Sequence, residues 1–215
     1  HKDHRNGLKA PPDMNLKTLL QLAARPGWCL RMMGTKRHQF GNIFGHVENV
    51  TDLSSLSDWS AAQFDETLNW NDIEWIKEQW GGPLILKGIL DPDDAKLAVK
   101  TGADALIVSN HGGRQLDGAP STISQLPTIL DATQGEIEVH LDGGIRTGVD
   151  IFRAKALGAQ GVYIGRPYLY GLGAMGKPGV ATAIEILRNE LDVTMALCGE
   201  RDINNVGKHN LLSSL

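Results

Sequence analysis

From residue 84 onward, the sequence alternates short apolar runs with segments of helical periodicity, and this alternation limits the fold more than any other feature. Four apolar runs occupy residues 84–89, 105–108, 137–141 and 161–164, and an amphipathic segment follows each of them. Short apolar strands that alternate with amphipathic helices are typical of a parallel sheet with right-handed crossovers. The pattern therefore predicts four βα units, arranged either as a doubly wound sheet or as a closed (β/α)8 barrel.

Polar and glycine-rich residues follow all four predicted strands, and their placement distinguishes the two arrangements. In a (β/α)8 TIM barrel the carboxyl ends of the strands meet at one rim, and a phosphate site typically belongs to the loops after strands seven and eight. A doubly wound sheet would show a G-x-G-x-x-G loop after its first strand, and none follows the first strand here. We therefore predict a TIM barrel of which this chain supplies strands five to eight. The residues expected at its rim are Lys87, Ser109, His111, Arg114, Asp142, Gly143, Gly144, Arg146, Gly165 and Arg166.

Local signals set the expected helix boundaries. A glycine-rich connection after residue 164 is expected to lead into a helix over residues 180–195. The other helices are expected to begin at Asn71, Asp91 and Thr147, with Asp150 completing a capping box, and to end at Gly81, Gly102 and Gly158.

The first third of the chain lacks this regularity. Apolar residues from Leu16 to Ala23 predict one short amphipathic helix, which Pro26 and Gly27 are expected to end, and residues 28–64 show no sustained period. We expect one domain over residues 1–215, incomplete at its amino terminus, with a loop or connection region at 1–69 and a half-barrel at 70–215. Within the loop region, Trp28, Met32, Met33 and Lys36 are expected either to cap the domain or to form an interfacial patch.

Composition excludes several classes of partner. A net charge of −4 on 215 residues provides no basic field for nucleic acid, although Lys36, Arg37 and His38 form a small local group that suits an anionic surface. The two cysteines, Cys29 and Cys198, form no metal-binding or redox motif, so we predict a reducing compartment and propose no metal site. No apolar run approaches the roughly 18 residues of a membrane span, and no signal peptide is expected.

The residue types at the predicted rim suggest specific chemistry. His111 and Arg114 stand three apart beside two glycines, so an imidazole that titrates near neutrality and a guanidinium fork are able to face one small anion. This arrangement suggests an acid or base beside a carboxylate-binding group, although a surface loop turned by its glycines remains an alternative. Arg146 precedes a helix start at Thr147, where main-chain N–H groups, the helix dipole and the Arg166 side chain favour an anion such as phosphate.

Lys87 interrupts an otherwise apolar strand, and a buried ammonium needs an anionic partner. Asp104 is one structural candidate for that partner. We favour a functional role instead, because a cation fixed beneath a ring that gains negative charge on reduction suits flavin chemistry. His140 also lies within a predicted strand, and we interpret it as a hydrogen-bonded histidine of the barrel interior.

Four motifs, in this order and spacing, resemble the FMN-dependent α-hydroxy acid dehydrogenases and oxidases. They are Leu-Lys-Gly-Ile, Ser-Asn-His-Gly-Gly-Arg-Gln-Leu-Asp, Asp-Gly-Gly-Ile-Arg-Thr-Gly and Ile-Gly-Arg-Pro. The resemblance covers nearly the whole chain, including residues 1–12, and within the family it is greatest to bacterial L-lactate dehydrogenases. It implies that Lys87 holds the flavin N1/O2 edge and Ser109 the ring, that His111 is the active-site base and Arg114 binds the substrate carboxylate. It further implies that residues 142–146, with Gly165 and Arg166, hold the ribityl and phosphate groups of FMN.

The resemblance also implies a reaction and its partners. His111 would remove a proton from an L-2-hydroxy acid, foremost L-lactate, while two electrons pass to FMN and then to a quinone, a cytochrome or oxygen. The family's first four strands supply further site residues that are absent here, so the chain is expected to be the carboxyl-terminal part of such a flavoprotein. We expect a cytoplasmic protein, with peripheral contact at the inner face of the membrane and homo-oligomers at full length.

Three alternatives remain open at this stage. The first is a 2-hydroxy acid oxidase of the glycolate or mandelate type, which uses oxygen. The second is another phosphate-binding TIM barrel, and the third is an inactive fragment or binding module descended from such an enzyme.

Overall fold

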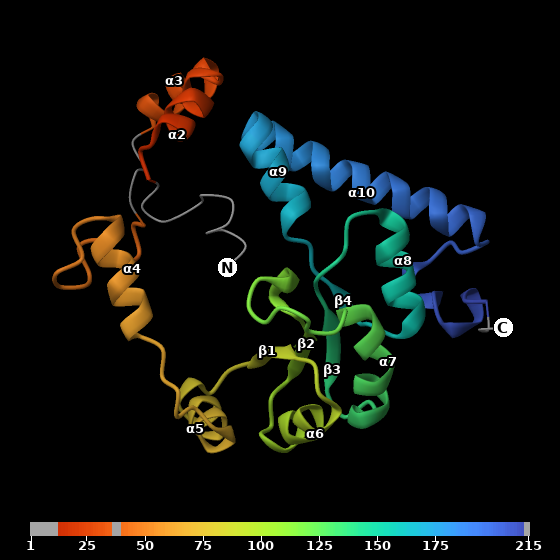
Figure 1. Cartoon of the computed structure of the whole chain (residues 1–215). Coiled ribbons are helices and arrows are strands. Elements are labelled where there is room, and N and C mark those ends of the chain that lie inside the picture. Colours follow the sequence, from red (N-terminus) through yellow and green to blue (C-terminus); the bar gives the residue numbers. More distant parts are fainter. Residues whose placement is uncertain (1–12, 36–39, 213–215) are drawn as a thin grey trace. The chain divides into compact units, whose positions relative to one another are not determined.

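The predicted alternation of strand and helix is present in the structure, a computed structural model that describes residues 13–35 and 40–212 (Figure 1). Residues 1–68 and 69–215 form two compact units. The prediction that residues 1–215 make up one domain is not tested by this division and stays a prediction. The resemblance noted for residues 1–12 and the basic group at 36–38 lie outside the described residues.

Four parallel strands form the sheet of the second unit. They are β1 (Ile85–Ile89), β2 (Ala105–Val108), β3 (Glu138–Leu141) and β4 (Gly161–Val162), and they lie side by side in chain order. Leu86 of β1 pairs with Leu106 of β2, which in turn pairs with Val139 of β3, and the register of β1 against β2 shifts between Lys87 and Ile89. All four strands therefore deliver their following loops to the same edge, as the βα pattern predicted.

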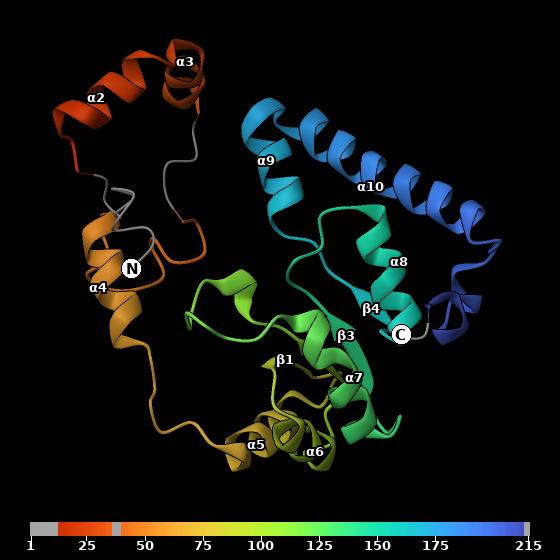
Figure 2. The same cartoon turned by 45° about the vertical axis from the view of Figure 1, so that its right-hand side comes forward.

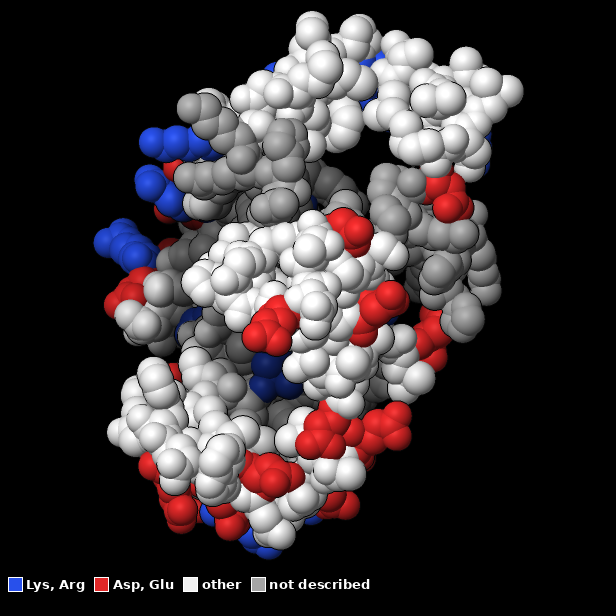
Figure 3. All heavy atoms as spheres, turned by 90° about the vertical axis from the view of Figure 1, so that its left-hand side faces the viewer, with Lys and Arg blue, Asp and Glu red and all other residues white. Residues whose placement is uncertain are grey.

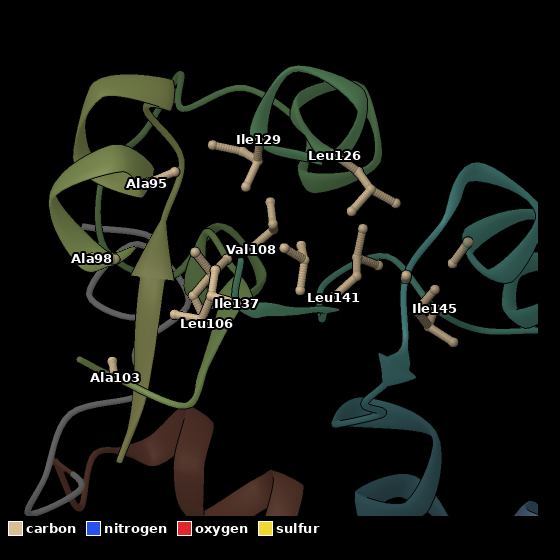
Figure 4. Packing of buried hydrophobic residues seen from close by; sticks show 13 residues of the cluster. Ala95, Ala98, Ala103, Leu106, Val108, Leu126, Ile129, Ile137, Leu141 and Ile145 are labelled. Atoms are coloured by element: carbon tan, nitrogen blue, oxygen red, sulfur yellow. The ribbon is translucent and has the colours of Figure 1, made fainter. Parts of the chain in front are cut away.

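One face of the sheet is covered by helices. The helices α6 (Pro92–Lys100) and α7 (Thr122–Thr133) pack against β1 and β2, the strands that they follow, and α8 (Gly148–Leu157), which follows β3, packs against β4. Leu126 and Ile129 of α7 point toward Val108 and Leu141 of the sheet (Figure 4), and all four side chains are fully buried. This layer supplies most of the apolar burial in the unit.

The opposite face of the sheet is more polar and more exposed. Ile85 is 47% exposed, and the Lys87 side chain, predicted to be buried, is also 47% exposed. The prediction of a fully buried first strand was therefore wrong, because β1 forms the edge of the sheet and its Leu86 and Ile89 side chains are only partly buried against the core.

Most predicted helix ends are confirmed. The carboxylate of Asp91 accepts a hydrogen bond from the Asp93 N–H at the start of α6, and Thr147 forms the expected capping box with Asp150 at the start of α8. The helix α5 (Trp70–Trp80) ends at Gly81 as predicted, but its cap is Asn69 and not Asn71. Asn69 adopts extended backbone and its side chain accepts from the Asn71 N–H, so Asn71 already lies inside the helix.

The glycine-rich connection after β4 is a helix, which the sequence pattern missed. The helix α9 (Arg166–Met175) precedes the predicted long helix α10 (Lys177–Leu197), and the two short 3₁₀ segments η2 (Ile203–Asn205) and η3 (Lys208–Asn210) follow. A G-x-G-x-x-G spacing does occur at residues 171–176, but it lies within and just after α9 and not behind a strand. The main chains of Gly171 and Gly179 contact each other, so these glycines allow α9 and α10 to pack closely.

The first unit also contains more helix than predicted. The helix α2 (Leu16–Ala23) is the expected amphipathic one, and α3 (Pro26–Gly34) and α4 (Leu53–Ala62) lie in the stretch predicted as a loop (Figure 2). Pro26 begins α3 at its first turn, where a missing N–H is harmless, so Pro26 starts a helix as well as ending one. Asp52 and Ser55 form a capping box for α4.

Figure 3 shows how charged side chains of the described residues are distributed on one face. On the face drawn in Figure 3, acidic side chains are dispersed among uncharged residues, and basic side chains of the described chain do not gather into a broad patch there.

We expect Gly171→Ala to destabilise the second unit by about 1–3 kcal/mol, because a Cβ at this position would overlap the main chain of Gly179. Gly173→Ala is the matched control in the same helix, since a Cβ there meets nothing within 4 Å. The control should be neutral or up to about 1 kcal/mol more stable, because alanine favours helix. Urea denaturation of both variants measures the difference, and equal stability would contradict the proposed close contact.

Candidate active site

One polar network joins strand β1 to the residues that directly follow β2 and β3. The Lys87 Nζ lies 2.7 Å from the Asp142 Oδ2 and donates a hydrogen bond to the Ser109 Oγ at 2.8 Å. The Ser109 hydroxyl in turn donates to the Asp142 Oδ1 at 2.6 Å. Strand order brings these residues together, since Lys87 lies within β1, and Ser109 and Asp142 directly follow β2 and β3.

The structural partner suggested for Lys87 was wrong. Asp104 lies at the other end of β2, where its carboxylate accepts from the Lys77 Nζ at 2.5 Å and from the Leu84 N–H at 2.7 Å. The hydrogen bond from Lys77, followed by the one from Leu84, lowers the pKa of Asp104 below its ordinary value. Asp104 therefore ties α5 to the start of β1, and Asp142 is the partner of Lys87 at the rim.

His111 occupies a tight left-handed turn directly after β2. The 3₁₀ turn η1 (His111–Gly113) has φ angles of +55°, +65° and +70° at its three residues. Glycine adopts such angles freely, whereas His111 does so at a cost, and strain of this kind clusters at functional sites. The His111 N–H donates to the Ser109 Oγ at 3.1 Å, and the Asn110 Oδ1 accepts from the Gly113 N–H at 3.2 Å.

Arg114 follows this turn in ordinary helical backbone, and both the His111 and Arg114 side chains are exposed. Asn110 was missed by the sequence analysis, although its position between Ser109 and His111 in the motif was a usable signal. Its side-chain amide also donates to the Pro120 carbonyl at 3.1 Å, so Asn110 closes the loop that leads to α7.

The loops after β2, β3 and β4 are joined to one another. The Thr122 hydroxyl at the start of α7 donates to the Gly143 carbonyl at 3.1 Å, and a Cβ at residue 143 would lie 3.0 Å from the Asn110 Oδ1. Gly143 and Gly144 have φ angles of +85° and +81°, so both positions favour glycine. The Arg166 Nη2, at the first residue of α9, donates to the Gly112 carbonyl at 2.8 Å.

The start of α8 differs from the sequence prediction. Its main-chain N–H groups were expected to face an anion, but the Asp150 carboxylate accepts from the Arg146 and Thr147 N–H groups, both at 3.0 Å. The Glu190 carboxylate of α10 accepts from the Gly148 N–H at 2.8 Å. An anion at this loop would therefore depend on Gly143, Gly144 and the Arg146 and Arg166 side chains, and not on the first turn of α8.

The interpretation of His140 agrees with the structure. Its Nδ1 lies 3.1 Å from the Tyr163 Oη and its Nε2 lies 3.1 Å from a Glu138 carboxylate oxygen. The rings of His140 and Tyr163 are stacked, with centroids 5.7 Å apart. His140 thus has partners for both ring nitrogens, and Tyr163 is a partner that the sequence analysis did not identify.

A cavity of about 340 Å³ lies beside the polar network. Its wall combines the cation of Lys87, the imidazole of His111 and apolar side chains such as Leu90 and Leu116, which suits a mostly apolar ring with a polar edge. The complete lining is Lys87, Gly88, Leu90, Ser109, Asn110, His111, Gln115, Leu116 and Ala119.

Comparison with known proteins decides the family. The profile of the FMN-dependent dehydrogenases matches residues 1–213. The chain belongs to this family. Family membership implies FMN as the cofactor, and the residues present fit it, because Lys87, Ser109 and His111 border one cavity while Gly143, Gly144 and Arg166 lie at the loops after the next two strands.

Curated relatives of this FMN-dependent dehydrogenase chain are L-lactate dehydrogenases. Those of Stenotrophomonas maltophilia (strain K279a) and Pseudomonas paraeruginosa are each 43% identical to it, over 215 and 217 residues. The match covers 99% of this chain and 56% of the Stenotrophomonas protein, so the chain spans about half the length of the relatives it matches.

Solved structures of the same family confirm the fold class. The monotopic membrane protein (S)-mandelate dehydrogenase matches with a TM-score of 0.89 and 33% identity, over 99% of this chain and 56% of that one. A mandelate oxidase with (S)-4-hydroxymandelic acid matches with a TM-score of 0.67 and 42% identity, over 71% of this chain and 43% of that one. The parallel βα units are thus the carboxyl-terminal part of an FMN-dependent TIM-barrel dehydrogenase fold.

We expect Asp150→Asn to destabilise the fold by about 1 kcal/mol at pH 7, because it weakens the cap of α8. Burial raises the pKa of Asp150, but the hydrogen bonds from the Arg146 N–H and from Thr147 outweigh burial, so the pKa lies below its ordinary value. A carboxyl whose pKa falls on folding stabilises the fold above its unfolded pKa of about 3.9, and this stabilisation disappears as the pH falls through the folded pKa.

The difference between wild type and Asp150→Asn should therefore shrink between pH 5 and pH 2 in urea denaturation. Asp131→Asn, at an exposed position near the end of α7, removes the same charge and is the matched control. A stability difference for Asp150→Asn that stays constant over this pH range would contradict the assignment.

Proposed function

We propose that this domain, together with the segment that its relatives carry before it, oxidises an L-2-hydroxy acid, foremost L-lactate to pyruvate, with FMN as cofactor. The observation that carries the proposal is the position of His111. Its strained turn is hydrogen-bonded to Ser109, and it shares a cavity with Lys87 at the carboxyl edge of a parallel sheet. The 43% identity to L-lactate dehydrogenases supports this choice of substrate.

Each rim residue has a proposed role. His111 acts as the general base and accepts a proton from the 2-hydroxy acid, and Arg114 binds the substrate carboxylate through its planar fork. FMN, when bound, would accept the two electrons and the second proton of the oxidation. Ser109 and Lys87 hold the flavin ring, and Asp142, Gly143, Gly144, Arg146, Gly165 and Arg166 hold its ribityl and phosphate groups.

The ion pair with Asp142 fixes the cation of Lys87 in place. Its ammonium is held by two partners from neighbouring strand ends, so it needs little reorganisation when negative charge develops beside it. The same ion pair reduces the desolvation cost of a lysine whose side chain is half exposed. Lys87 is therefore suited to stabilise the reduced form of a ring that occupies the adjacent cavity.

We expect His111→Gln to retain FMN but to lose at least about 100-fold in the rate of flavin reduction by L-lactate, because general-base action contributes roughly 10²- to 10⁴-fold. The measurement is anaerobic stopped-flow bleaching of the flavin absorbance. It uses this chain fused behind the amino-terminal segment of the Stenotrophomonas maltophilia relative.

Arg114→Lys is the matched control for this experiment. It keeps the positive charge but not the fork, so it should raise the L-lactate concentration needed for half-maximal rate and leave FMN bound. Normal bleaching by L-lactate in His111→Gln would exclude His111 as the base.

A 2-hydroxy acid oxidase is the second candidate function. It is favoured by the similarity to mandelate oxidase structures, which are 38–43% identical to this chain. The two candidates differ in the acceptor that reoxidises the flavin, which is a quinone or cytochrome for a dehydrogenase and oxygen for an oxidase. Comparing turnover with a quinone analogue and with oxygen distinguishes them.

Peripheral membrane contact at the inner face of the cytoplasmic membrane is part of the proposal. No helix among the described residues is long and apolar enough to span a membrane.

The helices α2 and α3 bury none of their residues. Lys17 and Arg31 lie on these helices, and Arg25 is the N-cap residue of α3. Their exposed large apolar side chains are Leu16, Leu19, Leu20, Trp28, Leu30, Met32 and Met33. An exposed apolar surface flanked by basic residues suits an anionic lipid surface, and one structure similar to this chain is described as a monotopic membrane protein. Lys36, predicted to join this patch, lies outside the described residues, and homo-oligomer formation stays a prediction.

We expect the double variant Leu20→Ser, Met33→Ser to reduce sedimentation with phosphatidylglycerol vesicles at least about threefold, because these side chains are 63% and 72% exposed. Trp75→Ser on α5 is the matched control, since Trp75 is 61% exposed but belongs to the other unit. If the wild type, the double variant and Trp75→Ser all sediment equally with the vesicles, the α2–α3 surface is not a membrane contact.

A further inference from the structure

The Arg166 side chain extends from the start of α9 to the turn that carries His111. The loop after β2 and the start of α9 lie at the same end of the sheet (Figure 1), and the Arg166 Nη2 donates to the Gly112 carbonyl at 2.8 Å. These two residues are 54 positions apart in the chain, so the contact joins two separate βα units.

Three main-chain polar groups of the turn are each hydrogen-bonded to a different side chain. Ser109 accepts from the His111 N–H, and the Asn110 side chain accepts from the Gly113 N–H. Both of these partners belong to the same loop as the turn. The Gly112 carbonyl is held from outside that loop, by Arg166.

The geometry at Gly112 is fitted to the guanidinium. A Cβ at this position would lie 3.3 Å from the Arg166 Nη1 and 3.5 Å from its Nη2, so a larger residue would push the fork away from the carbonyl. Gly112 has φ +65° and ψ +28°, and its neighbour His111 has φ +55° without the freedom of glycine. A charged donor on the carbonyl between them opposes relaxation of this strained backbone.

We propose that Arg166 is a positioning residue for His111, and that it couples the phosphate end of the cofactor site to the turn that carries the base. One N–H of the guanidinium holds the Gly112 carbonyl, and the remaining N–H groups of its planar fork would bind the phosphate. A phosphate that fixes the guanidinium therefore also fixes the turn. The consequence for catalysis rests on the proposed function, whereas the coupling itself does not.

The substitution Arg166→Lys separates the two roles of the side chain. A compact ammonium keeps a charge for phosphate, but it lacks the planar fork that contacts the carbonyl and the anion together. Arg166→Lys should therefore keep phosphate binding while losing its effect on the turn, whereas Arg166→Ala should lose both. Arg146→Ala is the matched control, because it removes an arginine from the neighbouring loop after β3 and leaves the Arg166 contact in place.

Amide hydrogen exchange of the full chain without FMN, followed by mass spectrometry, tests the proposal. We expect residues 110–114 to exchange about threefold to tenfold faster in Arg166→Lys and Arg166→Ala, as for the loss of one hydrogen bond to a charged donor at an exposed site. Arg146→Ala should exchange there at the wild-type rate. Unchanged exchange in both Arg166 variants, or equal acceleration in Arg146→Ala, would overturn the proposal.

Adding inorganic phosphate, against sodium chloride of equal ionic strength, tests the coupling directly. In wild type, phosphate should slow exchange at residues 110–114 as well as at residues 142–146. In Arg166→Lys, phosphate should slow exchange only at residues 142–146, and slowing at both segments would show that the coupling does not pass through Arg166. No hydroxy acid enters this experiment, so its outcome is independent of whether L-lactate proves to be the substrate.

Discussion

The ion pair between Lys87 and Asp142 exists only because three strands lie parallel and in register. It joins the edge strand β1 to the loop after β3 across β2, and the buried Ser109 hydroxyl at the end of β2 completes it. The same hydroxyl accepts from the His111 N–H, so both its donor and its acceptor capacity are in use. The contacts that hold Lys87 therefore also fix the position of the His111 turn relative to the sheet.

Features determined by neighbouring residues could be predicted from the sequence. The four strands, the Thr147–Asp150 capping box and the glycine ends of α5 and α8 each depend on a few adjacent side chains, so pattern and propensity were sufficient. The set of residues expected at the rim also followed from the order of strands. Which of these residues contact each other did not follow, because Lys87 had to be placed relative to both Asp104 and Asp142 before its partner was determined.

Features that depend on packing between distant segments were missed. The glycines of α9 indicate a loop when they are read locally, but Gly171 and Gly179 permit a close helix crossing that no local pattern encodes. Glu190 occupies an N–H of α8 from the middle of α10, and this contact removes part of the anion site that the helix start alone suggested. The error at Asn71 is of a smaller kind, since Asn69 and Asn71 are both good caps and only backbone conformation selects between them.

The contact of Glu190 with the Gly148 N–H also has a consequence for the order in which the molecule is built during synthesis. Gly148 lies so close to the main chain of α10 that a side chain at that position would overlap Glu190 and Leu191. The first turn of α8 therefore reaches its final form only after the ribosome has released residue 190, about 40 residues after α8 itself emerges. The loop that borders the proposed phosphate position is thus among the last parts of the domain to be completed, and a nascent chain that lacks α10 cannot present it in its final form.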